Sequence, residues 1–275
     1  MPGYLIVNAD DFGLTAGVSR GIIKAHRQGI LTSTTFMVNW PWAAELAPML
    51  REVPDLGVGI HLNLTSGRPV LPPEQVPTLV NRQGSFLKSL LHLYTAVDPA
   101  DARREWSAQV EKGIRLLGRL PTHLDTHRYL QGHPRYATVM IDVARTYNIP
   151  AVRCLYPGPD LALSDMVGPW NPTRLLVERF LRRSAEMVAG SGLACAQATM
   201  AGDFDLPKLM RKLGRVGPGV TELVSHPGEV DDQLRSLSSL QEHREVELAA
   251  LTAPDVRRRV EEAGITLVHF GHLSR

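Results

Sequence analysis

Cysteine is scarce in this 275-residue chain, which contains only Cys154 and Cys195. Two cysteines in a chain of this length exclude a disulfide framework and favour a reducing compartment. Long apolar runs are lacking too. No stretch approaches the roughly 18 apolar residues of a membrane-spanning helix, and the first apolar run reaches acidic residues by position 10. We therefore expect a cytoplasmic protein that does not insert into a membrane.

A predominance of one charge sign is also absent. The chain has 30 basic and 28 acidic residues, which gives a formal net charge of +2. Proteins that bind nucleic acid or anionic membranes through charge need a basic surface, so this balance argues against either partner. The short basic run at 257–259 is expected to lie on a solvated helix face.

Enough apolar material is present for one substantial core. Hydrophobic residues make up 44% of the chain, and 275 residues is a typical length for one α/β barrel rather than two domains. Short apolar runs alternate along the whole chain with stretches of helical periodicity, which indicates an α/β fold with a mainly parallel sheet. We expect a single domain over residues 1–275, most economically a barrel of seven or eight strands.

The expected elements follow from periodicity and from turn residues. Strands are predicted at 4–7, 32–38, 56–60, 121–127, 149–154, 193–198, 220–225 and 265–270. Helices are predicted at 16–28, 42–53, 99–117, 134–147, 173–189, 203–215 (with Asp203 at its N-cap), 238–251 and 254–263. Residues 65–85 are broken by proline and glycine. A loop of this length is interpreted either as a flap beside the site or as an inert surface insertion.

Polar side chains recur where the predicted strands end. They are Asp10, Asp11, His61, His127, Arg153 and His226. Each has an ordinary structural explanation, and the two aspartates alone would also fit the cap of the following helix. The C-terminal strand ends of a parallel α/β barrel share one rim, however, so their common position predicts one active site.

The stretch 121–127 is informative because strand side chains alternate between two faces. If it is extended, His123, Asp125 and His127 share one face. His123 and His127 would then lie roughly 13 Å apart, too far to ligate one ion without a bend in the chain. His127, nearer the C-terminal end, is the better ligand. Asp125 is a candidate partner for a ligating imidazole, which usually donates its other N–H to a carboxylate or carbonyl.

Aspartate and histidine on one rim form the donor set of a hydrolytic metal site. One aspartate and two histidines leave positions open for water and substrate, while a second carboxylate can accept a proton and a further histidine can protonate the leaving group. Arg153 can bind an anion, orient a carboxylate or form a structural salt bridge. Asp10 and Asp11 would point to opposite faces of a regular strand. Both can serve one site only if the strand has ended by Asp11, a bend that Gly13 favours.

Four segments carry a family resemblance. They are Asn-Ala-Asp-Asp-Phe-Gly at 8–13, Gly-Ile-His-Leu-Asn-Leu-Thr at 59–65, His-Leu-Asp-Thr-His at 123–127 and His-Pro-Gly at 226–228. In this order and spacing they resemble the YdjC-like carbohydrate deacetylases, a group that includes the chitooligosaccharide deacetylases and the hopanoid-biosynthesis-associated proteins. The resemblance extends over nearly the whole chain, and four separate motifs make it specific.

The resemblance implies a deformed (β/α) barrel that removes an acetyl group from an N-acetylated sugar with the help of a divalent metal ion. The metal ligands that it implies are Asp11, His61 and His127. It places the general base at Asp10 and brings His226 near the leaving amine. Apart from the resemblance, the position of Arg153 near a predicted strand end makes it a candidate orienting residue. Mg²⁺ and Zn²⁺ are the preferred ions, with Mn²⁺, Ni²⁺ and Fe²⁺ as alternatives. A homodimer is common among such enzymes.

The chain departs from many relatives at Tyr129 and Gln131, where further histidines are common. The metal set is unaffected, but the sugar can then differ from chitobiose. The expected activity is removal of the acetyl group from an N-acetylglucosamine-type oligosaccharide or conjugate. One alternative is a metal-dependent phosphoesterase, which would need more basic residues at the strand ends than Arg153 alone. The other is a non-catalytic sugar-binding or regulatory protein on the same fold.

Overall fold

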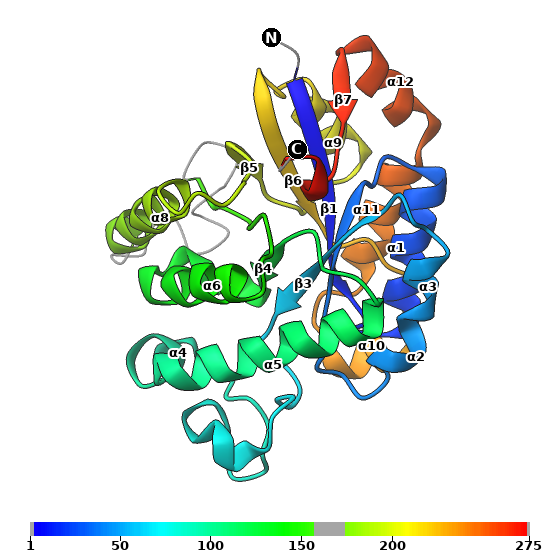
Figure 1. Ribbon diagram of the computed structural model, residues 1–275. Coiled ribbons are helices and arrows are strands. Elements are labelled where there is room, and N and C mark those ends of the chain that lie inside the picture. Colours follow the sequence, from blue (N-terminus) through cyan, green and yellow to red (C-terminus); the bar gives the residue numbers. More distant parts are fainter. Residues whose placement is uncertain (1–2, 157–173, 274–275) are drawn as a thin grey trace.

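A computed structural model of the chain describes residues 3–156 and 174–273. Its central strand is β1, Gly3–Phe12, which has partners along both edges. The sheet order is β4-β3-β2-β1-β6-β5, and β7 pairs with the start of β1. The other strands are β2 Ser33–Phe36, β3 Gly57–Leu62, β4 Leu124–Thr126, β5 Ala198–Met200, β6 Gly219–Ser225 and β7 Ile265–Leu267. All of these pairings are parallel, so the C-terminal strand ends lie on one side (Figure 1).

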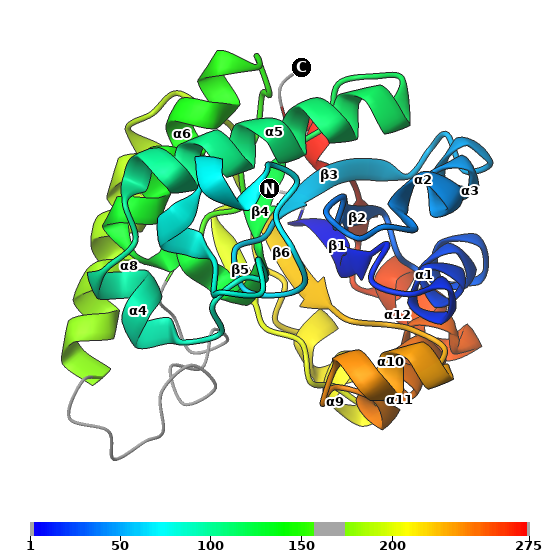
Figure 2. The same cartoon turned by 90° about the horizontal axis from the view of Figure 1, so that it is seen from below.

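The sheet is curled, and helices surround it (Figure 2). Beyond β4 it continues through isolated parallel bridges from Leu124 to Val152 and from Ala151 to Ala194, and the segment containing Ala194 leads into β5. The predicted α/β fold with a parallel, barrel-like sheet is therefore confirmed. The prediction of a regular strand at 149–154 is wrong, because only single bridges form there. Pro150 has no N–H that could donate to a ladder of hydrogen bonds. The strand predicted at 193–198 lies later, at β5.

Eleven helices lie in the described part of the chain. They are α1 Ala16–Gln28, α2 Ala43–Leu46, α3 Pro48–Arg51, α4 Leu90–Thr95, α5 Pro99–Leu117, α6 Pro134–Thr146, α8 Arg174–Ala189, α9 Leu206–Leu213, α10 Asp232–Leu237, α11 Glu242–Thr252 and α12 Pro254–Glu262. The side chain of Thr15 caps α1, and Gly118 ends α5 in the left-handed conformation. None of the described helices combines the length and the apolar character that crossing a membrane requires.

Three of the predicted helices differ from the observed ones. The stretch 42–53 is divided into α2 and α3 at Pro48, whose ring cannot continue the hydrogen-bond ladder of α2. The N-cap of α9 is Asp205, whose side chain accepts from Lys208 N, and not Asp203, which has a positive φ of 60°. The stretch 238–251 begins as a helix only at Glu242, after the separate helix α10.

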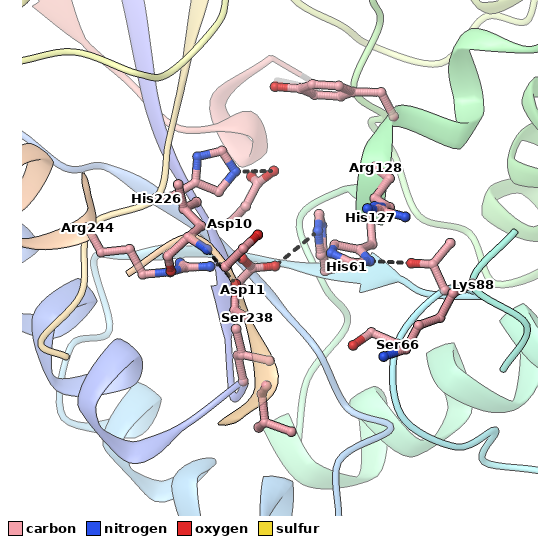
Figure 3. Close-up of a pocket in the computed structure, with 16 residues that line it drawn as sticks. Asp10, Asp11, His61, Ser66, Lys88, His127, Arg128, His226, Ser238 and Arg244 are labelled. Atoms are coloured by element: carbon pink, nitrogen blue, oxygen red, sulfur yellow. Dashed lines mark hydrogen bonds and ion pairs between the residues drawn. The ribbon is translucent and has the colours of Figure 1, made fainter. Parts of the chain in front are cut away.

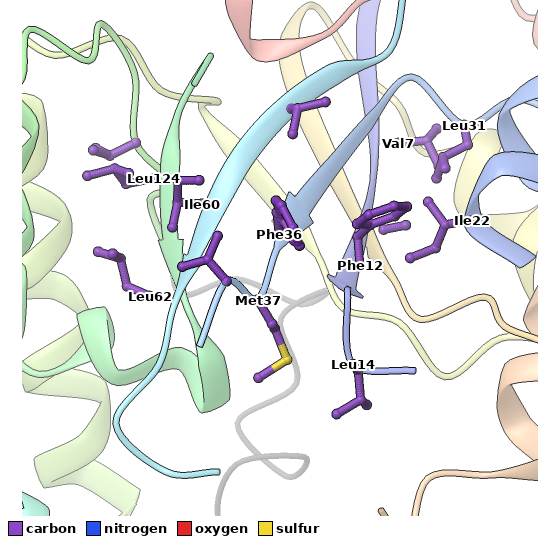
Figure 4. Close-up of a cluster of buried hydrophobic side chains, with 14 of the residues drawn as sticks. Val7, Phe12, Leu14, Ile22, Leu31, Phe36, Met37, Ile60, Leu62 and Leu124 are labelled. Atoms are coloured by element: carbon purple, nitrogen blue, oxygen red, sulfur yellow. The ribbon is translucent and has the colours of Figure 1, made fainter. Parts of the chain in front are cut away.

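A continuous hydrophobic core anchors the central strands (Figure 4). Phe12 of β1 and Phe36 of β2 meet edge to face, with ring centroids 5.4 Å apart. Ile60 and Leu62 of β3 are also fully buried. These apolar side chains lie next to the polar residues at the strand ends. Their packing therefore holds those polar residues in place.

The sequence led us to expect that the first strand ends before its aspartates, but β1 does not. It runs to Phe12, and the pairing with β2 shifts register between Ala9 and Phe12, where Asp11 has a positive φ of 71°. This bulge breaks the regular alternation of side chains, so two adjacent carboxylates can serve one site. Gly13 follows with φ of 89°, and a Cβ there would lie 2.6 Å from the ring of Phe36.

The segment 65–85 packs against α5. It contains two short 3-10 turns, Pro73–Gln75 and Pro77–Leu79. The carboxylate of Glu105 accepts hydrogen bonds from Val70 N (2.8 Å) and Leu71 N (3.1 Å) and so ties the segment to the helix. Its first residues belong to the wall of the candidate site.

Candidate active site

A cavity of about 310 Å³ opens at the C-terminal ends of the strands (Figure 3). Its volume lies within the usual range for small-molecule sites. Of the six residues predicted at strand ends, five line it: Asp10, Asp11, His61, His127 and His226. Arg153, the sixth, is fully buried and binds Asp10. The structure therefore brings all six together.

Asp10 is held in a fixed orientation by Arg153. Arg153 Nη1 donates to Asp10 Oδ2 at 2.8 Å and Nη2 donates to Oδ1 at 2.7 Å, while Asn8 Nδ2 donates to Oδ1 at 2.9 Å. Burial by itself would raise the pKa of this carboxyl, but Arg153 together with the nearby His61 and His226 outweighs burial and holds the pKa below its usual value. Asp10 is therefore ionised at neutral pH.

Arg153 also contacts two further carboxylates, those of Asp125 (Nη1 to Oδ2, 2.7 Å) and Glu222 (Nε to Oε1, 2.8 Å). One guanidinium cannot fully compensate three buried carboxylates. Burial raises the pKa of Glu222 to about 7 although Arg153 opposes this shift, and Glu222 Oε2 has no hydrogen-bond partner in the described part of the chain. Glu222 therefore carries its proton for part of the time near neutral pH.

Asp11 has one engaged and one open oxygen. Arg244 Nη2, from α11, donates to Oδ2 at 2.6 Å. Oδ1 is buried, accepts no hydrogen bond from any described residue and lies 3.5 Å from His61 Nε2. Burial would raise the pKa of Asp11, but Arg244 and the neighbouring histidines lower it below the usual value. The sequence analysis did not identify Arg244 as a site residue. Its role follows from a contact with Asp11, which is 233 positions away in the sequence.

His61, near the end of β3, is oriented by Asp125. Its Nδ1 lies 2.7 Å from Asp125 Oδ1, so the imidazole directs Nε2 toward Asp11. Burial would lower the pKa of this histidine, but Asp125 and Asp10 outweigh burial and raise it to about 9. The sequence predicted Asp125 as the carboxylate partner of a ligating imidazole. In the structure, the imidazole that it contacts is that of His61.

His127 follows β4 directly, where Arg128 and Tyr129 both have positive φ and turn the chain sharply. Its Nδ1 is hydrogen-bonded to Thr65 Oγ1, and its ring lies 5.6 Å from the ring of His61. Burial lowers its pKa to about 4, so the ring is neutral at pH 7.

His123 lies outside the cavity. Its ring stacks on Phe270 at 3.8 Å, and its Nδ1 lies 2.9 Å from Thr122 Oγ1. His123 precedes β4 and His127 follows it. The observed strand, Leu124–Thr126, is therefore shorter than the extended stretch 121–127 that the sequence predicted.

His226 follows β6, and a quarter of its side chain is accessible. Its Nε2 lies 4.0 Å from Asp10 Oδ2. Its backbone N–H donates to Glu247 Oε2 of α11 at 2.5 Å, and Glu247 Oε1 accepts from Asp203 N at 2.8 Å. Glu247, another residue that sequence reasoning missed, thus fixes the turn that carries His226.

Two overlapping sets of donors could hold a cation. The tighter set is Asp10, His61 and Asp125, whose donor atoms lie within 4.8 Å of one another. Arg153 already binds both of these carboxylates, and a cation between them would be repelled by the guanidinium. The looser set, Asp11, His61 and His127, faces the cavity and includes the open oxygen of Asp11. Its chemistry fits a divalent ion better.

Comparisons of this chain with known proteins agree on one family. A family described as YdjC-like protein matches residues 4–262. The carbohydrate deacetylase of Thermoanaerobacter pseudethanolicus is 34% identical over 274 residues, which is 98% of this chain and 99% of the relative. The carbohydrate deacetylase of Geobacillus stearothermophilus is 34% identical over 277 residues, 98% of each chain.

A solved structure also matches over the full length. The crystal structure of a putative cellobiose-phosphate cleavage protein from Enterococcus faecalis V583 superposes with a TM-score of 0.83 at 29% identity, and the match covers 100% of both chains. The sheet, the surrounding helices and the strand ends of this chain therefore follow an architecture that has been seen in a crystal.

Proposed function

This chain belongs to the YdjC-like protein family, and from that premise we propose that it is a metal-dependent hydrolase that removes the acetyl group from an N-acetylglucosamine-type sugar. Family membership confirms the resemblance carried by the four motifs. The observation that carries the proposal is the aspartate pair at the end of β1. Asp10 is held ionised by Arg153, while Asp11 offers an open oxygen toward His61. The names of the relatives support the same reaction and substrate class.

The proposed metal ligands are Asp11, His61 and His127. The open oxygen of Asp11 is buried, and a buried carboxylate oxygen without a hydrogen bond is costly unless a cation is near. His61 is held by Asp125 with Nε2 directed toward Asp11, and that nitrogen can bind an ion once it gives up its proton. The neutral ring of His127 is suited to ligation. A divalent ion held there, with Zn²⁺ or Mg²⁺ preferred, would supply Lewis acidity toward an amide carbonyl and an attacking water.

Asp10 is the proposed general base. Arg153 and Asn8 hold its carboxylate beside the cavity, so it can take the proton of a water that attacks the acetyl carbon. His226, 4.0 Å from Asp10, is the proposed acid that donates a proton to the departing amine nitrogen. Water and amide are thereby converted to acetate and a free amino sugar, and the proton taken by one residue is balanced by the proton given by the other.

Acetate release from a panel of N-acetylated oligosaccharides, with Zn²⁺ or Mg²⁺ added, tests the proposal. We expect release by the wild-type protein and a loss of about 10² to 10⁴-fold in Asp10→Asn. Asp255→Asn, at an exposed position on α12, is the matched control and should keep the wild-type rate. If no sugar of the panel yields acetate from protein that contains the ion, the proposal is wrong.

A metal-dependent phosphoesterase is the second candidate. The cavity is lined by Lys88, Arg128 and Arg244, which are basic groups beyond Arg153 that a phosphate could use. Phosphate release from an aryl phosphate, measured beside acetate release, separates the two reactions. Phosphate without acetate would favour this candidate.

A further inference from the structure

Arg244 is the second buried arginine of the site. The residue is 1% exposed and belongs to the wall of the cavity. Its Nη2 donates to Asp11 Oδ2 at 2.6 Å, and its Nε donates to the backbone oxygen of Leu240 at 3.1 Å. In Figure 3, Arg244 reaches toward Asp11 from the side of α11. Two of its three guanidinium nitrogens are therefore engaged.

The third nitrogen, Nη1, is buried and has no hydrogen-bond partner among residues 3–156 and 174–273. A buried N–H of a charged group that lacks an acceptor costs free energy, and native proteins rarely leave one unpaired. Arg244 lines the cavity, so a ligand there can supply the missing acceptor after a small shift of the side chains that cover Nη1. Carbonyl and carboxylate oxygens are the acceptors that suit a guanidinium best.

The direction of Nη1 is preset by packing. The bonds to Asp11 and Leu240 fix the plane of the guanidinium. The stem of Arg244 passes close to Gly228, where a Cβ would lie 3.3 Å from Arg244 Cδ, and Gly228 N donates to Arg244 O at 3.2 Å. The glycine of the 226–228 motif thus leaves room for this arginine. A preorganised donor loses little entropy when it binds a ligand.

We propose that Arg244 Nη1 is the donor that binds an oxygen of the acetyl group, as a carbonyl in the substrate and as a carboxylate in the product acetate. This inference rests on the proposed deacetylase function. The amide must come within reach of Asp10 and His226, and Asp11, the next residue after Asp10, is bonded to Arg244. The acetyl end of the substrate is therefore the part that lies beside Arg244.

The test is acetate binding, measured by calorimetry on protein loaded with Zn²⁺ and compared at equal measured zinc content. Arg244→Lys keeps the positive charge but loses the fork of donors, and Arg244→Gln loses both. In each variant we expect the dissociation constant for acetate to rise about tenfold or more. Arg235→Lys is the matched control, because Arg235 is exposed on α10 and pairs with Glu242. Its affinity for acetate should equal that of the wild type.

A second ligand separates recognition from a purely structural effect. The glucosamine disaccharide lacks acetyl groups, so its affinity should be the same in the wild type, Arg244→Lys and Arg244→Gln. A parallel loss of affinity for acetate and for the disaccharide would mean that Arg244 only supports the shape of the site, which would overturn the inference.

Two further outcomes are decisive. Acetate that binds the Arg244 variants as well as the wild type, or that does not bind the wild type, also overturns the inference. If the wild type releases no acetate from any sugar while acetate binding still depends on Arg244, the deacetylase proposal fails but the assigned role of Arg244 as an acyl-oxygen donor stands.

Discussion

At the scale of single residues, two arginines give adjacent aspartates different chemistry. Arg153 binds both oxygens of Asp10, whereas Arg244 binds only one oxygen of Asp11. A carboxylate with both oxygens paired to a guanidinium is a poor cation ligand, but the pairing holds it in a fixed position beside the cavity. A carboxylate with one open oxygen can ligate. The bulge at Asp11 makes this division possible because it turns the two side chains independently.

The buried carboxyl of Glu222 leads to a prediction about pH. Its pKa is about 7 in the folded protein against 4.5 in the unfolded chain, so the folded state holds the proton more tightly. The free energy of unfolding must therefore fall as the pH rises from about 4.5 to about 7. Glu222→Gln cannot titrate and lacks this contribution. Relative to the variant, the wild type should lose about 1 to 3 kcal/mol over that range.

Urea unfolding of both proteins at pH 5, 6, 7 and 8 measures this difference. Contributions from other shifted groups, such as Glu105, are present in both proteins and largely cancel. A difference in unfolding free energy that does not change with pH would show that Glu222 has an ordinary pKa.

At the scale of secondary-structure elements, two helices support the site through buried polar side chains. On α11, Arg244 and Glu247 are three positions apart and therefore share a face. They bind Asp11 and the backbone of His226, respectively. On α5, Glu105 anchors the segment 65–85. The first residue of that segment, Thr65, is hydrogen-bonded to His127.

Glu105→Gln should loosen this segment. A glutamine has one acceptor oxygen where the carboxylate uses two, so Val70 N or Leu71 N loses its partner. We expect a loss of about 1 to 3 kcal/mol in the free energy of unfolding, together with faster hydrogen exchange at these two amides. Glu111→Gln, on an exposed part of the same helix, is the control. Unchanged exchange at Val70 and Leu71 would refute the anchoring role.

At the scale of the whole molecule, the proposed metal ligands come from three strands. Asp11 lies on β1, His61 on β3 and His127 directly after β4, and these three residues lie far apart in the sequence. Only the assembled sheet brings them together. An ion that binds there binds the folded state and not the unfolded chain, so it must stabilise the whole fold.

Removal of the ion with a chelator should therefore lower the Tm, and Zn²⁺ added back should restore it. At a free ion concentration of about 100 times Kd, the stabilisation is about 2.7 kcal/mol. Asp11→Asn should lose most of this response, whereas Asp10→Asn should keep it although its turnover is lost. The reverse pattern would exchange the roles of the two aspartates, and a Tm unaffected by chelator in the wild type would argue against a bound ion.

Local chemistry was sufficient to predict much of the fold. The helices 16–28 and 99–117 have the predicted bounds because Thr15 and Gly118 cap them, and caps are local signals. The strand ends were readable because apolar runs stop at polar or turn residues. From those ends alone, the parallel topology implies that six polar residues share a rim, and the structure brings all six together. Their catalytic and metal-binding roles stay predictions.

Tertiary structure decided what depends on distant partners. The bulge at Asp11 lies beyond Ala9, where the pairing of β1 with β6 ends, and before Phe12, which pairs with Phe36 of β2; no local pattern reveals this arrangement of distant partners. Arg244 and Glu222 looked like ordinary polar residues of a helix and a strand. Their significance comes from carboxylates and guanidinium groups that lie far away in sequence. Sequence thus determined which residues reach the rim, and packing determined that Asp11 keeps one open oxygen while both oxygens of Asp10 are paired.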